Sequence, residues 1–195
     1  MTKKEPGIVV GVSNRHVHLS KEDLEVLFGK GYQLTPVKDL RQPGQFAAKE
    51  TVTIVGPKGA IENVRVLGPI RKETQVEISR TDAFKLGLNP PVRDSGDLDG
   101  TPGIVIVGPA GVVVKNKGVI LAKRHIHMHP KDAQHYGVKD KDIVRVIVEK
   151  GERRLIFDDV LVRVREDFAL EFHVDTDEAN AAMLNNGDLV YIVEL

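Results

Sequence analysis

Histidines separated by a single residue occur twice in this sequence and are its clearest candidates for chemistry. The first pair is His16 and His18, and the second is His125 and His127, with His129 close behind. Residues two apart in a strand project from the same face, so each pair directs two imidazoles to one place. A single pair is a weak signal, but two pairs in matching contexts predict two metal sites.

Each pair needs a third ligand, because a catalytic zinc ion usually has three protein ligands and one open position. For the first site, Glu77 alternates with apolar neighbours and is placed on the polar face of a short strand. For the second site, His173 alternates with apolar neighbours in the same way. On spacing alone, either residue could equally be a solvated surface residue.

The ligand types also predict the charge of each site. Two neutral histidines and one carboxylate leave a zinc site with a charge of about +1, and three neutral histidines leave about +2. Both sites would attract anions. Arg71 lies on the same nominal strand face as Glu77 and could hold a phosphate oxygen in a bidentate fork, although an exposed arginine more commonly has no chemical role.

Composition excludes several other functions. The 28 basic residues balance the 28 acidic ones, so neither nucleic acid nor a membrane is an expected partner. Cysteine is absent, which excludes disulfides, thiolate metal sites and a cysteine nucleophile. No apolar run approaches the roughly 20 residues of a membrane helix, and the first residues lack a secretory signal. We therefore expect a soluble, cytoplasmic protein.

Short, evenly spaced strands should position these side chains. Runs rich in Val and Ile predict strands at 7–12, 51–55, 75–78, 104–107 and 143–148. The segments 56–59 and 108–111 carry Gly and Pro and predict hairpin turns. Such a pattern is typical of a mainly β chain built as barrels or a sandwich.

Helices are expected to be few and short, each beginning at a capping signal. The signals are Ser20 with Asp23, Ser79 with Asp82, Pro130 in a first turn, and Asp175 with Glu178. These helices would cover the barrel ends. The segment 15–23, which includes the first histidine pair, recurs as 124–132 and indicates two related halves. The polar stretch 90–103 between them has the composition of an ordered functional loop.

Taken together, these segments resemble the phosphate propanoyltransferases, or phosphotransacylases, of the PduL type, which occur with bacterial microcompartments and in the cytoplasm. The likeness covers nearly the whole chain. Its carriers are GVSNRHVH at 11–18, GPIR at 68–71, QVE at 75–77, VRDSGD at 92–97, RHIH at 124–127 and EFHVDTDEAN at 171–180.

The resemblance implies two β-barrel domains capped by short helices. The first would span 15–122, and the second would span 123–195 and be completed by an N-terminal strand at 5–14. It also implies a dinuclear zinc site. His16, His18 and Glu77 would bind one zinc ion, and the second ion would be bound by His125, His127 and His173.

The substrate contacts are carried over from the family in the same way. Arg71 would be the catalytic, phosphate-binding residue. The contacts to coenzyme A would come from Ser13, Asn14, Arg65 and Asn180, with either Lys38 or Lys58 at the nucleotide end. Microcompartment members carry an N-terminal encapsulation extension that is not seen in this sequence, which favours the cytoplasm.

The reaction implied is the reversible exchange of coenzyme A for phosphate on a propanoyl or acetyl group, and the acyl length stays open. Direct attack by phosphate is the simpler hypothesis, because cysteine is absent and no Ser/His/Asp order is evident. A metal-dependent hydrolase and a non-catalytic binding module are the alternatives. We expect a homodimer, because small barrels with exposed sheet edges often pair.

Overall fold

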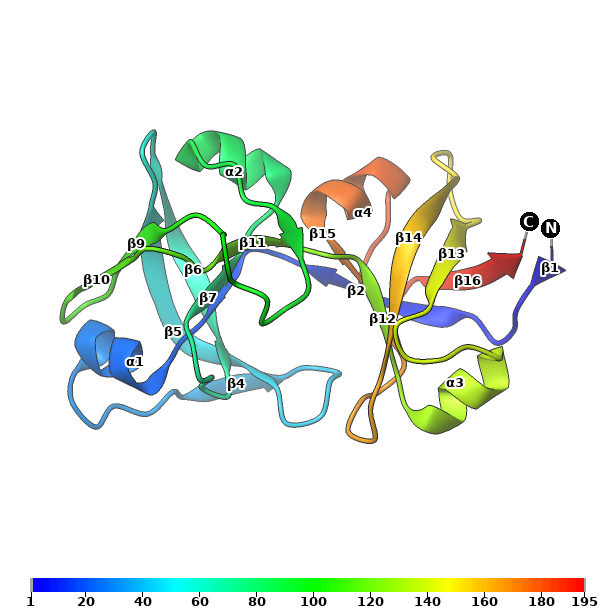
Figure 1. The fold of residues 1–195 in the computed structure, drawn as a ribbon, viewed down its shortest axis with the longest axis horizontal. Helices are drawn as coiled ribbons and strands as arrows, with labels where there is room; N and C mark the ends of the chain where they lie inside the picture. The colour runs from blue at the N-terminus through cyan, green and yellow to red at the C-terminus, as the bar shows by residue number, and fades with distance from the viewer. Residues whose placement is uncertain (1, 195) are drawn as a thin grey trace. The chain divides into compact units, whose positions relative to one another are not determined.

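The computed structural model describes residues 2–194, which fall into two compact units. Unit 1 comprises the described residues up to Ser13, the short segment Arg41–Pro43 and the described residues from Lys123 onward. Unit 2 comprises Asn14–Leu40 and Gly44–Ala122. Each unit is mainly β structure with two short helices (Figure 1).

Unit 1 is a closed barrel of six strands. The strand order is β16-β13-β14-β12-β15-β2, and β2 also pairs with β16, which closes the ring. A short strand, β1, extends the sheet beside β16. The strands are β1 (Thr2–Lys3), β2 (Ile8–Ser13), β12 (His125–Met128), β13 (Ile143–Val148), β14 (Leu155–Val164), β15 (Glu171–Asp175) and β16 (Leu189–Glu194).

The barrel of unit 1 is filled by alternate residues of its strands. Ile126 and Phe172 face each other across β12 and β15 and are fully buried. Val160 and Ile192 belong to the same apolar cluster. Because alternate residues of a strand point to opposite faces, the histidines that flank Ile126 point away from this core.

Unit 2 is a curled, open sheet of nine strands that forms half a barrel. Its order is β10-β9-β5-β6-β3-β7-β11-β8, with β4 beside β5. The strands are β3 (His16–His18), β4 (Pro36–Asp39), β5 (Phe46–Val55), β6 (Ala60–Gly68), β7 (Gln75–Glu77), β8 (Val92–Arg93), β9 (Ile104–Val107), β10 (Val112–Lys115) and β11 (Val119–Ala122). Its core includes the fully buried residues Val17, Ile54 and Ile106.

Both predicted hairpin turns are confirmed, and both pack on helix ends. In the turn between β5 and β6, the Gly56 amide donates to the Gly59 carbonyl at 2.9 Å. The Gly108 amide donates to the Gly111 carbonyl at 2.9 Å between β9 and β10. A Cβ on Gly56 would lie 2.3 Å from the Leu86 carbonyl oxygen, so this close approach requires glycine.

Four helices begin where the capping signals predict them. They are α1 (Lys21–Phe28), α2 (Arg80–Leu86), α3 (Pro130–Tyr136) and α4 (Thr176–Ala182). Ser20, Ser79 and Asp175 accept hydrogen bonds from the backbone of the first turn, and His129 does so at α3. None of these helices has the length and apolar character needed to span a membrane.

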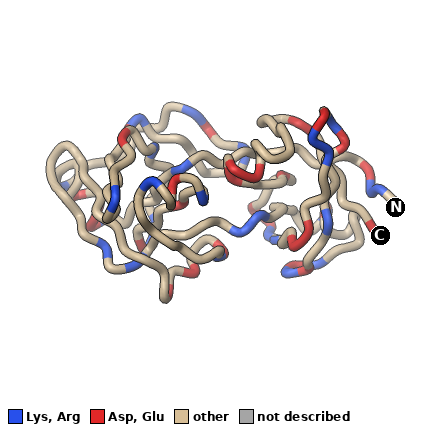
Figure 2. Tube along the Cα trace, turned by 90° about the horizontal axis from the view of Figure 1, so that it is seen from above, with Lys and Arg blue, Asp and Glu red and all other residues tan. Residues whose placement is uncertain are grey.

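The prediction of a mainly β chain with two barrel-like domains and short helical caps is confirmed. The repeat also reappears in three dimensions: β3 leads into α1 as β12 leads into α3. Lys and Arg are interspersed with Asp and Glu along the trace of each unit (Figure 2), in keeping with the balanced composition.

Candidate metal centres

In unit 2, two neighbouring strands bring the first candidate group together. β3 and β7 pair antiparallel, with His16 opposite Glu77 and His18 opposite Gln75. Nε2 of His16 lies 3.4 Å from Oε2 of Glu77, and Nε2 of His18 lies 3.8 Å from Oε1. One ligand atom from each of these three residues lies within 4.8 Å of the other two. We call this group the carboxylate group.

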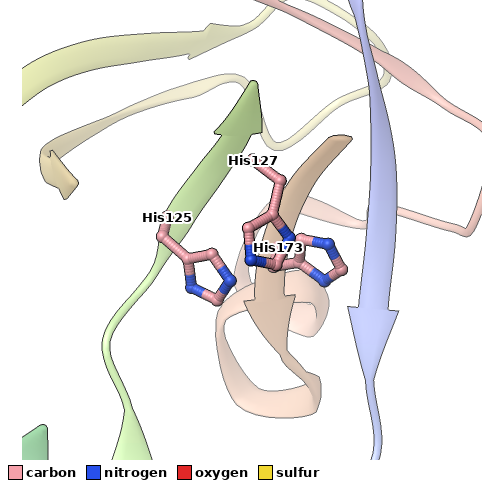
Figure 3. A group of neighbouring side chains, drawn as sticks. All are labelled: His125, His127 and His173. Atoms are coloured by element: carbon pink, nitrogen blue, oxygen red, sulfur yellow. The ribbon is translucent and has the colours of Figure 1, made fainter. Parts of the chain in front are cut away.

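In unit 1, β12 and β15 repeat the arrangement. His125 lies opposite His173, and His127 lies opposite Glu171. His125, His127 and His173 place one ligand atom each within 4.8 Å of the others. Their ring centroids are 4.6 to 4.9 Å apart, and the three rings point toward one another (Figure 3). We call this group the histidine group.

The protonation states of the histidines suit metal binding. Burial, reinforced by the charges of His16 and Arg71, lowers the pKa of His18 well below its usual value. Burial also lowers the pKa of His127. Both rings are therefore neutral near pH 7, and the buried Nδ1 atom of each has no hydrogen-bond partner among the described residues. The same holds for Nε2 of His173. Unsatisfied buried nitrogens in both groups fit sites that a further partner such as a metal ion would complete, because buried polar atoms are normally satisfied.

The carboxylate of Glu77 is ionised, as a ligand must be. Burial would raise its pKa, but the charge and hydrogen bonding of His16, together with His18 and Arg71, lower it well below the usual value. The same contact acts in reverse on His16: burial would lower its pKa, and Glu77 raises it. A divalent ion would replace this proton as the partner of the carboxylate.

The first histidine of each pair is oriented by a backbone carbonyl two residues earlier. Nδ1 of His16 lies 2.8 Å from the Asn14 carbonyl oxygen, and Nδ1 of His125 lies 2.7 Å from that of Lys123. A ring that donates from Nδ1 has Nε2 free to bind a metal. In both units, a backbone carbonyl therefore determines which ring nitrogen of the first histidine is available to a metal.

An arginine next to each pair ties the ligand strands to a helix. Arg15 Nε donates to both carboxylate oxygens of Asp82, at 2.9 and 2.8 Å, at the start of α2. Arg124 Nη1 donates to Oε1 of Glu178 at 2.7 Å, at the start of α4. Each of these helices begins shortly after the third member of its group, so each arginine connects one ligand strand to the other.

Arg71 reaches the carboxylate group through a loop that sequence reasoning identified only as functional. Its Nη1 donates to Ser95 Oγ at 2.8 Å. Gln75 Nε2 also donates to Ser95 Oγ, at 2.9 Å, and donates to Oε1 of Glu77. The amide of Gly96 donates to Oε1 of Gln75 at 2.7 Å. The loop 90–103 is thereby fixed beside the ligands. Ser95 lies within the VRDSGD motif, which is the signal that could have identified it.

Two further residues of unit 1 were missed by sequence reasoning. Glu171 is buried two positions before His173, and its Oε2 lies 3.0 Å from His173 Nε2. Gln42 Nε2 donates to the same carboxylate oxygen at 2.8 Å. Burial would raise the pKa of Glu171, but these two neighbours lower it. Alternation along β15 could have indicated Glu171, whereas no local signal indicates Gln42.

The residues predicted to contact coenzyme A are distributed over both units. In unit 1, Ser13 ends β2 and Asn180 is exposed on α4. In unit 2, Asn14 is exposed just before β3, and Arg65 lies on β6 in register with His16. Arg65 Nη1 donates to the backbone carbonyls of 48 and 49. Each therefore has a polar side chain at or near the surface of its own unit.

The remaining histidines lie outside both groups. His129 caps α3 and lies 3.0 Å from Glu166, and His135 Nε2 lies 2.7 Å from the Glu5 carbonyl oxygen. Lys38, on β4, and Lys58, in the turn after β5, are both exposed. Neither lysine is distinguished from the other by these positions.

Comparisons with known proteins all point to the same family. The sequence model of the family described as phosphate propanoyltransferase matches residues 9–185. A Thermotoga maritima protein named phosphate propanoyltransferase is 86% identical over 194 residues, which cover 100% of this chain and 92% of that protein. Proteins of the same name from Rhodopseudomonas palustris and Clostridioides difficile are 55% and 56% identical, over 95% and 98% of this chain and 81% and 91% of their own lengths.

Proposed function

The chain belongs to the phosphate propanoyltransferase family, and from that premise we propose that it exchanges coenzyme A for phosphate on a propanoyl or acetyl group with the help of two zinc ions. It is an acyltransferase, as its relatives are named. The family name indicates a propanoyl group and phosphate; propanoyl-CoA is the proposed acyl donor, and acetyl-CoA is the proposed second substrate.

The observation that carries the proposal is the occurrence of two ligand groups on one repeated scaffold. In this proposal, His16, His18 and Glu77 hold one ion and His125, His127 and His173 hold the other. Imidazole and carboxylate ligands suit zinc, and three protein ligands leave a position for substrate. A zinc ion bound there would supply a Lewis acid for a thiolate or a carbonyl oxygen.

Arg71 is the proposed phosphate-binding residue. Its guanidinium lies beside the carboxylate group, where Ser95 Oγ accepts a hydrogen bond from Nη1. A guanidinium can bind two of the four phosphate oxygens in one plane, which would orient one of the other two toward an acyl carbon. Ser95 and Gln75 would hold Arg71 and Glu77 in a fixed relation. Arg71 donates to Ser95, and Gln75 donates to both Ser95 and Glu77.

The proposed reaction is a direct displacement. A phosphate oxygen attacks the thioester carbonyl carbon and forms the new C–O bond. The C–S bond then breaks and its electron pair leaves with the coenzyme A sulfur. A covalent intermediate on cysteine is excluded because the chain has no cysteine. The protein would contribute mainly by orienting the two substrates and by stabilising charge.

Coenzyme A would be bound by Ser13, Asn14, Arg65 and Asn180, with either Lys38 or Lys58 at its nucleotide end. The polar character of these side chains and their surface positions support this assignment. We further propose that the enzyme acts as a homodimer in the cytoplasm. Sedimentation equilibrium of the purified chain would test the dimer directly.

One experiment tests both the metal and the reaction. We expect two zinc ions per chain by mass spectrometry of unchelated protein, and thiol release from propanoyl-CoA that depends on added phosphate. Acetyl-CoA should support the same reaction at a different rate. Thiol release at an equal rate without phosphate would instead identify a hydrolase, and a protein free of metal would refute the proposed centres.

A further inference from the structure

A residue outside both ligand groups is placed to control one of them. We propose that Glu171 is a positioning residue of the histidine group: its carboxylate accepts a hydrogen bond from Nε2 of His173, leaves Nδ1 for the ion, and lowers the charge of the loaded site. This inference rests on the metal sites of the proposed function.

Strand pairing places Glu171 beside two members of the histidine group. The two residues are neighbours on the same face of β15, and Glu171 lies directly opposite His127 on β12. Oε2 of Glu171 lies 3.0 Å from His173 Nε2. This nitrogen is buried and has no hydrogen-bond partner among the described residues. Glu171 lies within hydrogen-bond distance of it, so the proposed bond would satisfy the nitrogen.

The carboxylate is held in place from its other side. Gln42 Nε2 donates to Oε2 of Glu171 at 2.8 Å and to the Ala169 carbonyl at 2.9 Å, while Gln42 Oε1 accepts from the Ala169 amide at 3.2 Å. Gln42 and Glu171 are only 3% and 8% exposed. A buried glutamine with three such bonds fixes the carboxylate far better than solvent would.

The backbone of β2 leaves space for this carboxylate. A Cβ built on Gly11 would lie 2.6 Å from Oε1 and 3.0 Å from Cδ of Glu171. Gly11 is in register with His173, and a side chain there would displace the carboxylate of Glu171 by close approach. Three separate elements, β15, β2 and the segment around Gln42, are thus arranged around one acidic side chain.

A carboxylate at this position has a clear electrostatic purpose. Three neutral histidines would leave a zinc ion with a charge of about +2 in a largely buried place, whereas one adjacent carboxylate reduces it to about +1. A hydrogen-bonded carboxylate also fixes the tautomer of a ligand histidine. In unit 2, the equivalent position holds the neutral residue Gln75, and the negative charge there comes from the proposed ligand Glu77.

The decisive variant is Glu171→Gln, which removes the charge but keeps the size and the contact with Gln42. The readout is the metal content of the full chain after dialysis against a graded series of chelator concentrations. We expect one of two zinc ions to be lost at chelator concentrations about 10 to 100 times lower than for the unaltered chain. The cobalt-loaded protein should also show a changed visible absorption spectrum.

The matched control is Glu50→Gln in unit 2. Glu50 is also buried, and it accepts hydrogen bonds from Tyr32 Oη at 2.9 Å and the Thr35 amide at 3.0 Å, neither of which belongs to a ligand group. This control should retain both ions. A second variant, Gly11→Ala, keeps the carboxylate but displaces it, and should weaken retention of the same ion. It also serves as the test if Glu171→Gln does not fold.

The outcomes separate this inference from the proposed function. If the unaltered chain binds two ions, and Glu171→Gln and Gly11→Ala retain both as firmly, Glu171 has no positioning role and the metal centres stand. If the unaltered chain binds no metal, the proposed function fails and this inference fails with it. Loss of one ion only, with an altered cobalt spectrum, supports the assignment.

Discussion

The two units build their ligand groups on the same frame but place the acid differently. Both use a histidine pair on a short strand, an opposing strand with the third member, and an arginine that contacts the following helix. In unit 2 the acid is the third member itself, Glu77, and its neighbour is Gln75. In unit 1 the third member is His173, and the acid is its neighbour Glu171.

The surroundings differ as well. The carboxylate group has two hydrogen-bond donors beside it, the side chains of Arg71 and Gln75, and both donate to Ser95 Oγ. The histidine group has an acceptor beside it, the carboxylate of Glu171, with Gln42 behind. The repeat therefore supplies geometry twice, whereas a few side chains decide what each site can bind. If both groups bind zinc as proposed, we expect unit 2 to bind the substrate anion and unit 1 to hold its ion without contacting phosphate.

The strongest test of this comparison removes one ligand from each unit. We expect His16→Ala and His125→Ala each to lose one zinc ion and to lower turnover by more than about 10³-fold, beyond the usual effect of a single electrostatic contact. Zinc content and phosphate-dependent thiol release would be measured on both variants. Full activity in either variant would mean that its unit provides no catalytic metal.

A smaller effect on activity is expected when Arg71, the proposed phosphate-binding residue of unit 2, is replaced and compared with a surface arginine of unit 1. Arg71→Ala should lower kcat/KM for phosphate by about 10² to 10³, with both zinc ions retained, because a phosphate contact is lost but no metal ligand is removed. The control Arg145→Ala removes a guanidinium that pairs with Asp158 on the surface, and should change little. An unchanged KM and kcat for phosphate in Arg71→Ala would remove the assignment.

Local signals explain how much of this could be predicted from sequence. Helix caps and hairpin turns depend on residues within four positions of one another, so Ser20, Ser79, Asp175 and both turns were identified correctly. The histidine pairs depend only on strand alternation. Glu77 and His173 do lie opposite these pairs, but strand register was needed to place them there.

Long-range contacts explain what sequence reasoning missed. Gln42 meets Glu171 across 129 residues, and nothing in the sequence near Gln42 indicates that contact. Arg71 was expected on the strand face of Glu77, but β7 begins only at Gln75 and Arg71 forms an isolated bridge with Ser20. It reaches the carboxylate group through Ser95 instead. His129 was a candidate ligand by spacing, and the structure uses its side chain as a helix cap.

A third prediction compares the contributions of Arg15 and Arg124 to the free energy of unfolding. Arg15→Gln would leave Asp82, whose side chain is 5% exposed, without its charged partner, at a cost of about 2 to 3 kcal/mol. Arg124→Gln should cost less, about 1 to 2 kcal/mol, because Glu178 is 22% exposed. Urea unfolding of each variant would measure these costs. Equal losses, or a larger loss for Arg124→Gln, would contradict this ranking.

The smallest expected effect concerns the caps of the two helices that follow the histidine pairs. Ser20 Oγ accepts from the Asp23 amide at 3.2 Å, and Ser20→Ala should cost about 1 kcal/mol in the free energy of unfolding. His129→Ala should cost about half as much, because Nδ1 accepts from the Lys131 amide at 3.1 Å on a more exposed side chain. Neither change should alter zinc content. Loss of an ion in His129→Ala would instead enlarge the histidine group to four members and remove the symmetry between the two units.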